Sequence, residues 1–168
     1  QALDGVPGRF ENVDCGQDFL VIVDYAHTDD ALVQVLDAVR EITSGRIIVV
    51  FGAGGDRDRS KRSRMGEAVG RGSDVAVVTS DNPRNEDPLE IIKMITDGIK
   101  SVRGEYESVP DRRRAIKRAF EAAEPGDCVV VAGKGHETVQ VMGGRSLPFD
   151  DRGVVRELLD EFNARRNS

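Results

Sequence analysis

The four residues Asp81 to Arg84, Asp-Asn-Pro-Arg, offer the densest set of binding groups in the chain. An arginine grips a carboxylate through two parallel hydrogen bonds, and the Asp81 carboxylate suits an ammonium. The Asn82 amide both donates and accepts, while Pro83 biases Asn82 toward an extended conformation. These groups together suit the zwitterionic head of an amino acid. A polar turn that closes a strand is the alternative interpretation.

A glycine-rich loop at 52–55 is followed by Asp56, Arg57, Asp58 and Arg59. The loop is not a nucleotide P-loop, because that motif needs Gly-Lys-Ser/Thr at its end. It also lacks the third glycine of a dinucleotide fingerprint, since Arg57 stands at that position. Its arginines could hold a carboxylate, and a plain solvated loop is the alternative.

Two further polar clusters follow apolar runs. Asp24 and His27 could serve acid–base chemistry or contact a nucleotide, or they could cap the next helix. The turn Gly133 to Glu137, Gly-Lys-Gly-His-Glu, offers Glu137 for an ammonium and Lys134 for a phosphate or carboxylate. A surface loop of mixed charge is the alternative there. No serine, cysteine or threonine pairs with a base as a nucleophile, and no metal-ligand spacing occurs, so we assign no catalytic residue and no metal site.

The elements that position these clusters are apolar runs that alternate with helical patterns. This order predicts an α/β fold, a Rossmann-like, mostly parallel sheet of about six strands covered by helices on both faces. The stretch 139–142 is assigned to an antiparallel edge strand. Buried or short strands are predicted at 18–25, 46–51, 74–79, 106–109 and 128–132, with a further short strand ending near Asp14. Helices are predicted after Thr28 and at 60–71, 88–100, 112–123 and 151–162, with a frayed tail at 163–168.

Ligands of such sheets bind beyond the carboxyl ends of the strands. Four strand ends here lead into polar or glycine-bearing loops, at 24–27, 52–59, 80–84 and 133–137. We therefore expect all four loops on the same rim of the sheet.

The bulk composition fits one globular domain of 168 residues with a net charge of −6. This charge disfavours nucleic acid as a partner, and no apolar run approaches the ~20 residues that span a membrane. Cys15 and Cys128 are expected as reduced, structural thiols, and the arginines at 112–114 as solvated helix charges. We expect a cytoplasmic monomer that binds small molecules, with no nucleic-acid or membrane partner.

The combination of motifs resembles the C-terminal domain of the Mur ligases, and within that family the diaminopimelate-adding branch. The resemblance covers nearly the whole chain, and the combination is far more specific than any one motif. It is carried, in chain order, by Gly8–Glu11, Val23–Thr28, Phe51–Asp58, Lys61-Arg62, Met65-Gly66, Asp81–Arg84 and Ala132–Glu137. One departure is Asp29, where the family usually has proline; an acid in a first helical turn is equally acceptable.

The resemblance implies that residues 1–168 form one domain, which binds the incoming amino acid. Domains for the UDP-sugar and for ATP would lie outside this chain, and the isolated domain would be inactive. The whole ligase would activate the D-glutamate carboxylate of UDP-N-acetylmuramoyl-L-alanyl-D-glutamate as an acyl phosphate. The amine of meso-diaminopimelate would then attack it. ATP and Mg²⁺ would be bound mainly by the central domain.

By the same resemblance, seven residues would hold meso-diaminopimelate, and Asp24 and His27 would face ATP. The seven are Arg57, Asp81, Asn82, Pro83, Arg84, Gly133 and Glu137. Lysine lacks the second carboxylate and would leave Arg84 unpaired, a strong basis for rejection. Two alternatives stay open: a stand-alone module that binds an amino acid or nucleotide, and a related folylpolyglutamate or cyanophycin-type ligase. Those ligases are not expected to carry Asp-Asn-Pro-Arg.

Overall fold

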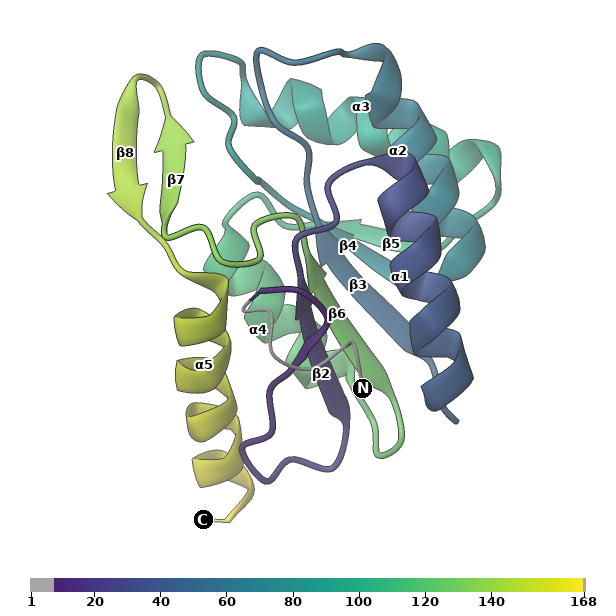
Figure 1. Ribbon diagram of the computed structural model, residues 1–168, viewed down its shortest axis with the longest axis vertical. Helices are drawn as coiled ribbons and strands as arrows, with labels where there is room; N and C mark the ends of the chain where they lie inside the picture. Colours follow the sequence, from purple (N-terminus) through teal and green to yellow (C-terminus); the bar gives the residue numbers. More distant parts are fainter. Residues whose placement is uncertain (1–7, 168) are drawn as a thin grey trace.

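A six-stranded sheet forms the centre of the computed structural model, which describes residues 8–167. Its strand order is β1-β2-β6-β3-β4-β5 (Figure 1). Neighbours pair in parallel except β1, which runs antiparallel to β2 at one edge. The strands are β1 (Glu11–Asn12), β2 (Leu20–Asp24), β3 (Ile47–Phe51), β4 (Val75–Val78), β5 (Tyr106–Ser108) and β6 (Cys128–Ala132). The predicted mostly parallel sheet with one antiparallel edge strand is confirmed.

The identity of the antiparallel edge strand was predicted wrongly. The stretch 139–142 forms β7 (Val139–Met142), which pairs with β8 (Arg145–Pro148) in a separate two-stranded hairpin. Gly143 and Gly144, between the two strands, both have positive φ, the backbone that a two-residue hairpin turn requires. The Gly-Gly pair was the sequence signal for this hairpin.

Five helices, α1 (Asp29–Ile42), α2 (Ser60–Gly72), α3 (Pro88–Ser101), α4 (Arg112–Ala122) and α5 (Asp151–Arg166), cover the sheet within the described residues. Thr28, Asp87 and Asp111 cap α1, α3 and α4 through their side chains, as predicted. None of these helices is long and apolar enough to cross a bilayer.

The final helix extends further than predicted, because α5 continues to Arg166 where a frayed tail was expected. Phe162 packs against the core, and the Asn163 amide donates to the carbonyl of Cys15 at 2.8 Å. Tertiary contacts thus extend a helix whose last turns are polar in sequence. Ser168 lies outside the described residues.

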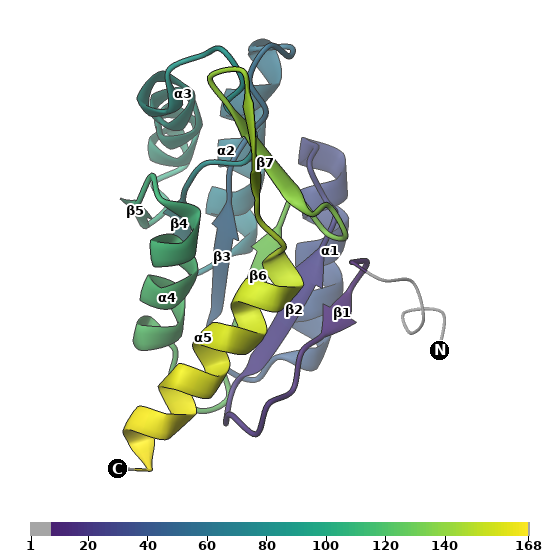
Figure 2. The same cartoon turned by 90° about the vertical axis from the view of Figure 1, so that its left-hand side faces the viewer.

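Successive residues of the central strands point into two separate cores. Val49 and Phe51 of β3 face α1, α2 and α3, whereas Ile48 and Val50 face α4 and α5. In Figure 2, α4 and α5 lie on the viewer's side of the sheet. Burial on both faces explains why the strands read as continuous apolar runs, and it leaves their carboxyl ends as the place for polar groups.

Candidate functional site

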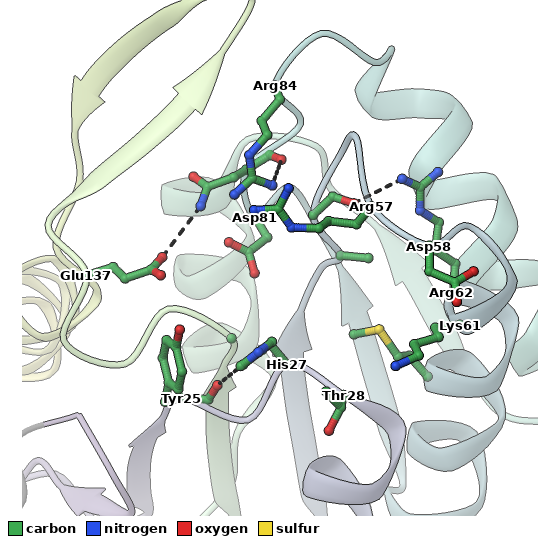
Figure 3. A pocket seen from close by; sticks show the side chains of 15 residues that line it. Tyr25, His27, Thr28, Arg57, Asp58, Lys61, Arg62, Asp81, Arg84 and Glu137 are labelled. Atoms are coloured by element: carbon green, nitrogen blue, oxygen red, sulfur yellow. Dashed lines mark hydrogen bonds between the residues drawn. The ribbon is translucent and has the colours of Figure 1, made fainter.

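The carboxyl ends of the strands surround a cavity of about 360 Å³. All four polar loops contribute to its lining together with α2, which confirms the shared rim (Figure 3). The lining residues are Tyr25, His27, Thr28, Ala53, Gly54, Arg57, Asp58, Lys61, Arg62, Met65, Asp81, Asn82, Arg84, Gly133 and Glu137.

Most of the predicted site residues are among these lining residues, but Pro83 and Asp24 are not. Pro83 lies against the glycine-rich loop, where a Cβ added at Gly55 would come within 1.8 Å of its carbonyl oxygen. The Asp24 carboxylate accepts hydrogen bonds from the backbone N–H groups of Phe10 (2.6 Å) and Ala26 (2.7 Å). Asp24 therefore links the segment that leads into β1 to the loop that follows β2.

His27 is exposed at the cavity rim, where its Nδ1 lies 2.9 Å from the carbonyl oxygen of Tyr25. Neither His27 nor Asp24 caps α1, because the Thr28 hydroxyl accepts from the N–H of Ala31 instead. Helix capping by these two side chains, the alternative interpretation of this cluster, is thus wrong. The ATP-facing role that the resemblance implies for them stays a prediction.

Arg84 is held from two sides. Its N–H donates to the carbonyl of Val141 in the hairpin, and its guanidinium donates from Nη1 to the carbonyl of Gly55 at 3.0 Å. The backbone of Arg84 is left-handed, with a φ of 53°, which is uncommon for a residue with a side chain. Figure 3 shows its guanidinium turned toward the cavity, beside that of Arg57. The arrangement presents two cations to one ligand.

Asp81 is the most enclosed carboxylate of the lining, with 6% of the residue exposed. Its nearest cation is the Lys134 ammonium, with 3.8 Å between Nζ and Oδ1. Burial raises the pKa of the Asp81 carboxyl, although Arg112 and Lys134 act in the opposite direction. A buried carboxylate whose nearest cation lies beyond hydrogen-bond distance is suited to receive an ammonium from a ligand.

Lys134 does not point into the cavity, so its interpretation as a phosphate or carboxylate ligand is wrong. Its side chain is fully buried, and Nζ donates to Asn82 Oδ1 at 3.2 Å and to the carbonyl of Val139. It also lies 3.7 Å from Glu137 Oε1, and burial lowers the pKa of the ammonium. Lys134 thus links Asn82 of the segment 81–84 to Glu137 and to the start of the hairpin.

The Asn82 side chain is largely used inside the protein. Its Oδ1 accepts from Lys134 and from the N–H of Val141 at 2.8 Å, and its Nδ2 lies 3.5 Å from Glu137 Oε1. Gln140 adds a hydrogen bond from Nε2 to the carbonyl of Asp81 at 2.8 Å. These bonds dock the hairpin onto the segment 81–84, and they leave Nδ2 as the group of Asn82 nearest to a carboxylate of the lining.

The opposite side of the cavity is built by an ion pair that sequence reasoning missed. Arg62 is buried and donates to both oxygens of Glu86, at 2.7 and 2.9 Å, and to the carbonyl of Gly54 at 3.0 Å. Glu86 also accepts from the N–H of Asp56, and these hydrogen bonds lower its pKa to about 2. Arg62 and Glu86 are 24 residues apart, so no local pattern indicates the pair.

The environment of Arg112 also differs from the prediction. This residue was interpreted as a solvated helix charge, but it is buried and paired with the equally buried Asp151. The charge of Asp151 and its hydrogen bonds raise the pKa of the guanidinium against the opposing effect of burial. The helix cap that precedes it, Asp111, was predicted correctly. The burial of Arg112 in the first turn of α4 was not predicted.

The chain matches the model of the family described as Mur ligase, glutamate ligase domain, over residues 8–135. It is 55% identical over 161 residues to the UDP-N-acetylmuramoyl-L-alanyl-D-glutamate--2,6-diaminopimelate ligase of Alkaliphilus metalliredigens. This alignment covers 96% of the chain and 33% of the relative, so the chain spans about a third of the length of such relatives.

Solved structures agree with this similarity. A UDP-N-acetylmuramoyl-L-alanyl-D-glutamate--2,6-diaminopimelate ligase superposes with a TM-score of 0.88 and 44% identity, over 96% of this chain and 33% of that one. A bifunctional folylpolyglutamate synthase/dihydrofolate synthase, solved with Mn, AMPPNP and L-glutamate bound, superposes with a TM-score of 0.61 over 77% of this chain and 29% of that one. At 21% identity, the second likeness shows the shared fold alone.

Proposed function

The chain belongs to the Mur ligase, glutamate ligase domain family, and from this premise we propose that it is the amino-acid-binding domain of an ATP-dependent ligase. The ligase would join meso-diaminopimelate to UDP-N-acetylmuramoyl-L-alanyl-D-glutamate through an acyl phosphate during peptidoglycan synthesis. Residues 1–168 would form its C-terminal domain, preceded by domains for the UDP-sugar and for ATP. The one-third coverage of the curated relatives supports this division.

The observation that carries the proposal is the charge arrangement around the cavity. Arg84 and Arg57 line the same cavity as the carboxylates of Asp81 and Glu137, so the cavity offers both partners that an amino-carboxylate head requires. Diaminopimelate carries such a head at the end of its side chain, in addition to the amine that reacts. Arg84 would bind the carboxylate of this distal head, and Asp81 with Glu137 would bind its ammonium.

The same arrangement would discriminate against lysine. Lysine ends in an ammonium without a carboxylate, so Arg84 would stay unpaired in a partly closed cavity. A site built to pair with a polar group rejects an analogue that lacks the group, because its own buried partner is then left unsatisfied. We therefore expect selection at the distal head of the amino acid.

This chain would contribute binding and orientation to the reaction, while ATP and Mg²⁺ would be held mainly by the central domain. Within residues 8–167 no three His, Cys, Asp or Glu side chains are grouped to hold a metal ion. The glycine-rich loop also lacks the lysine of a P-loop. His27, exposed at the rim, is the side chain that we expect to meet ATP, and Asp24 would hold the loop that carries His27.

The test is calorimetric titration of the chain with meso-diaminopimelate and with L-lysine, on the wild type and on Arg84→Ala. We expect diaminopimelate to bind more tightly than lysine and Arg84→Ala to abolish the difference. Arg103→Ala is the matched control, because Arg103 also has a left-handed backbone, with a φ of 59°, but does not line the cavity. It should leave the preference unchanged.

Tighter binding of lysine, or a preference that Arg84→Ala does not alter, would overturn the substrate assignment and leave the fold as it is. The same two amino acids should then be compared as substrates, with ATP, in the full-length protein. Preferred use of glutamate in that assay would favour a folylpolyglutamate-type ligase. Binding without any turnover would favour a stand-alone binding module.

A further inference from the structure

The buried guanidinium of Arg112 joins two strand ends that are not neighbours in the sheet. Its Nη1 donates to the carbonyl of Ser80 and its Nη2 to the carbonyl of Ala132, both at 3.1 Å. Ser80 lies just beyond β4, and Ala132 is the last residue of β6. Since β3 lies between these two strands, no ladder hydrogen bond connects them. Arg112 therefore spans the position of β3 at the rim.

The two bridged carbonyls directly precede the residues that carry the site. Asp81 follows Ser80, and Gly133, which opens the turn to Glu137, follows Ala132. Gly133 also approaches Asp81 closely, because a Cβ added to it would come within 2.9 Å of Asp81 Oδ2. Any change in the separation of the two strand ends would therefore change the distance between the carboxylates that line the cavity.

Asp151 fixes the guanidinium from the other side. Its two oxygens accept from Nε at 2.8 Å and from Nη2 at 2.7 Å, and both side chains of the pair are fully buried. A buried ion pair contributes little to stability compared with apolar residues of the same volume, because both charges must be desolvated. The planar fork of arginine, however, offers fixed donor directions that a lysine ammonium cannot supply.

We propose that Arg112 is a positioning residue that sets the separation of the segment 80–84 from the segment 133–137, with Asp151 orienting its guanidinium. Neither residue lines the cavity, so their effect on a ligand is indirect. The consequence for ligand selection rests on the proposed function: a fixed separation would match Arg84, Asp81 and Glu137 to the two charges of one amino-carboxylate head.

The test is amide hydrogen exchange, resolved by residue, on the chain and on two variants with the same chemical change. Arg112→Lys alters the buried fork, and Arg113→Lys alters the next residue of α4. Arg113 is the matched control because it also pairs with α5, through Glu157 at 2.9 Å and Glu161 at 3.1 Å, but at the surface. Both variants keep the charge and remain on the same helix.

We expect Arg112→Lys to accelerate exchange at least tenfold at the hydrogen-bonded amides of Arg84, Gly133 and Glu137. Exchange at Ile95 and Ile99, in the interior of α3, should stay within twofold, and Arg113→Lys should change neither group. Equal acceleration at all of these amides would mean that Arg112 only stabilises the fold, and this would overturn the proposal. So would no acceleration at the three loop amides.

A second variant covers the case in which Arg112→Lys does not fold. The pair Arg112→Met with Asp151→Leu removes both charges and keeps the volume, a replacement that folded proteins often tolerate. It leaves the two carbonyls without their donor, so the same three loop amides should exchange at least tenfold faster. Wild-type exchange at the three amides, or failure of both variants to fold, would overturn the positioning role.

Titration of the variants with diaminopimelate and lysine separates this proposal from the proposed function. If the wild type discriminates between the two amino acids, Arg112→Lys should reduce the ratio of their affinities at least fivefold, and Arg113→Lys should not. A lower fraction of folded protein would not alter this ratio. If the wild type does not discriminate, the proposed function fails, and the exchange measurement still decides the role of Arg112.

Discussion

The two sides of the cavity are built in opposite ways. The strand-end wall, formed by Asp81, Asn82, Gly133 and Glu137, is mostly buried and is tied from within by Lys134 and Arg112. The glycine-loop wall, formed by residues 53–58 and Lys61, presents two exposed cations, Arg57 on the loop and Lys61 in the first turn of α2, and its loop is anchored by Arg62 and Glu86. Each wall therefore has residues that line the cavity and charged residues behind them that fix their positions.

The difference indicates where selectivity should come from. Charges in an enclosed setting interact strongly with a ligand and tolerate few alternatives, whereas exposed charges are screened by water and salt. We therefore expect the strand-end wall together with Arg84 to decide which amino acid binds, and the glycine-loop wall to add a smaller attraction. Arg84 joins the two walls through its hydrogen bond to the carbonyl of Gly55.

The largest expected effect comes from separating the two walls. Gly55 donates to the carbonyl of Asn82 at 2.7 Å, and a Cβ at this position would lie 1.8 Å from the Pro83 carbonyl oxygen. We expect Gly55→Ala to lower the free energy of unfolding by about 3 kcal/mol, measured by urea denaturation. The control Gly153→Ala, in α5, has no neighbour nearer than 3.5 Å and should be neutral or stabilising. Wild-type stability of Gly55→Ala would show that the walls are not in contact.

The next effect concerns the enclosed charge of the strand-end wall. Asp81→Asn removes the carboxylate that we expect to pair with a ligand ammonium, so the affinity for diaminopimelate should fall about 10- to 100-fold. A folded spectrum by circular dichroism is the check that binding, and not folding, was lost. An affinity within twofold of the wild type would exclude Asp81 from the ammonium site.

The pH dependence of binding follows from the direction of the Asp81 shift. Burial raises the pKa of this carboxyl, and the ammonium needs its charged form. Affinity should therefore be full above the raised pKa and decline as the pH falls through it, beginning above the ordinary aspartate range near 3.8. Calorimetry from neutral pH down to the ordinary aspartate pKa of 3.8 measures this decline, which Asp81→Asn should remove. Asp58→Asn should retain it, because hydrogen bonds from Ser60 lower the pKa of Asp58. Affinity that is constant over this range would contradict the assignment.

The smallest effect is expected on the glycine-loop wall. Arg57 is exposed, and an exposed ion pair contributes about 0.2–1 kcal/mol, so Arg57→Ala should weaken diaminopimelate binding by no more than about fivefold. The contribution of Arg57 to diaminopimelate binding in the wild type should decrease with added salt. Arg64→Ala, on the same helix as Lys61 but outside the cavity, serves as the control. A loss from Arg57→Ala as large as that from Asp81→Asn would mean that the two walls do not differ in the way we describe.

Much of the fold was predictable because its signals are local. The apolar runs of β2, β3, β4 and β6 and the caps Thr28, Asp87 and Asp111 lie within a few residues of the elements that they define. The alternation of strands and helices then required a parallel sheet, and a parallel sheet places the four polar loops on one rim. The sequence itself determined where the chemistry of this protein gathers.

Only the tertiary structure decided which charges meet a ligand and which support the site. Lys134 and Glu137 belong to the same turn, yet Lys134 is fully buried and Glu137 lines the cavity. Arg112 and Arg113 are adjacent, yet Arg112 bridges two strand ends and Arg113 lies at the surface. The partners that settle these roles, such as Asp151 for Arg112 at a separation of 39 residues, are brought close by folding alone. A short-range pattern reports residue type and spacing, whereas burial of a charge depends on partners that the pattern does not contain.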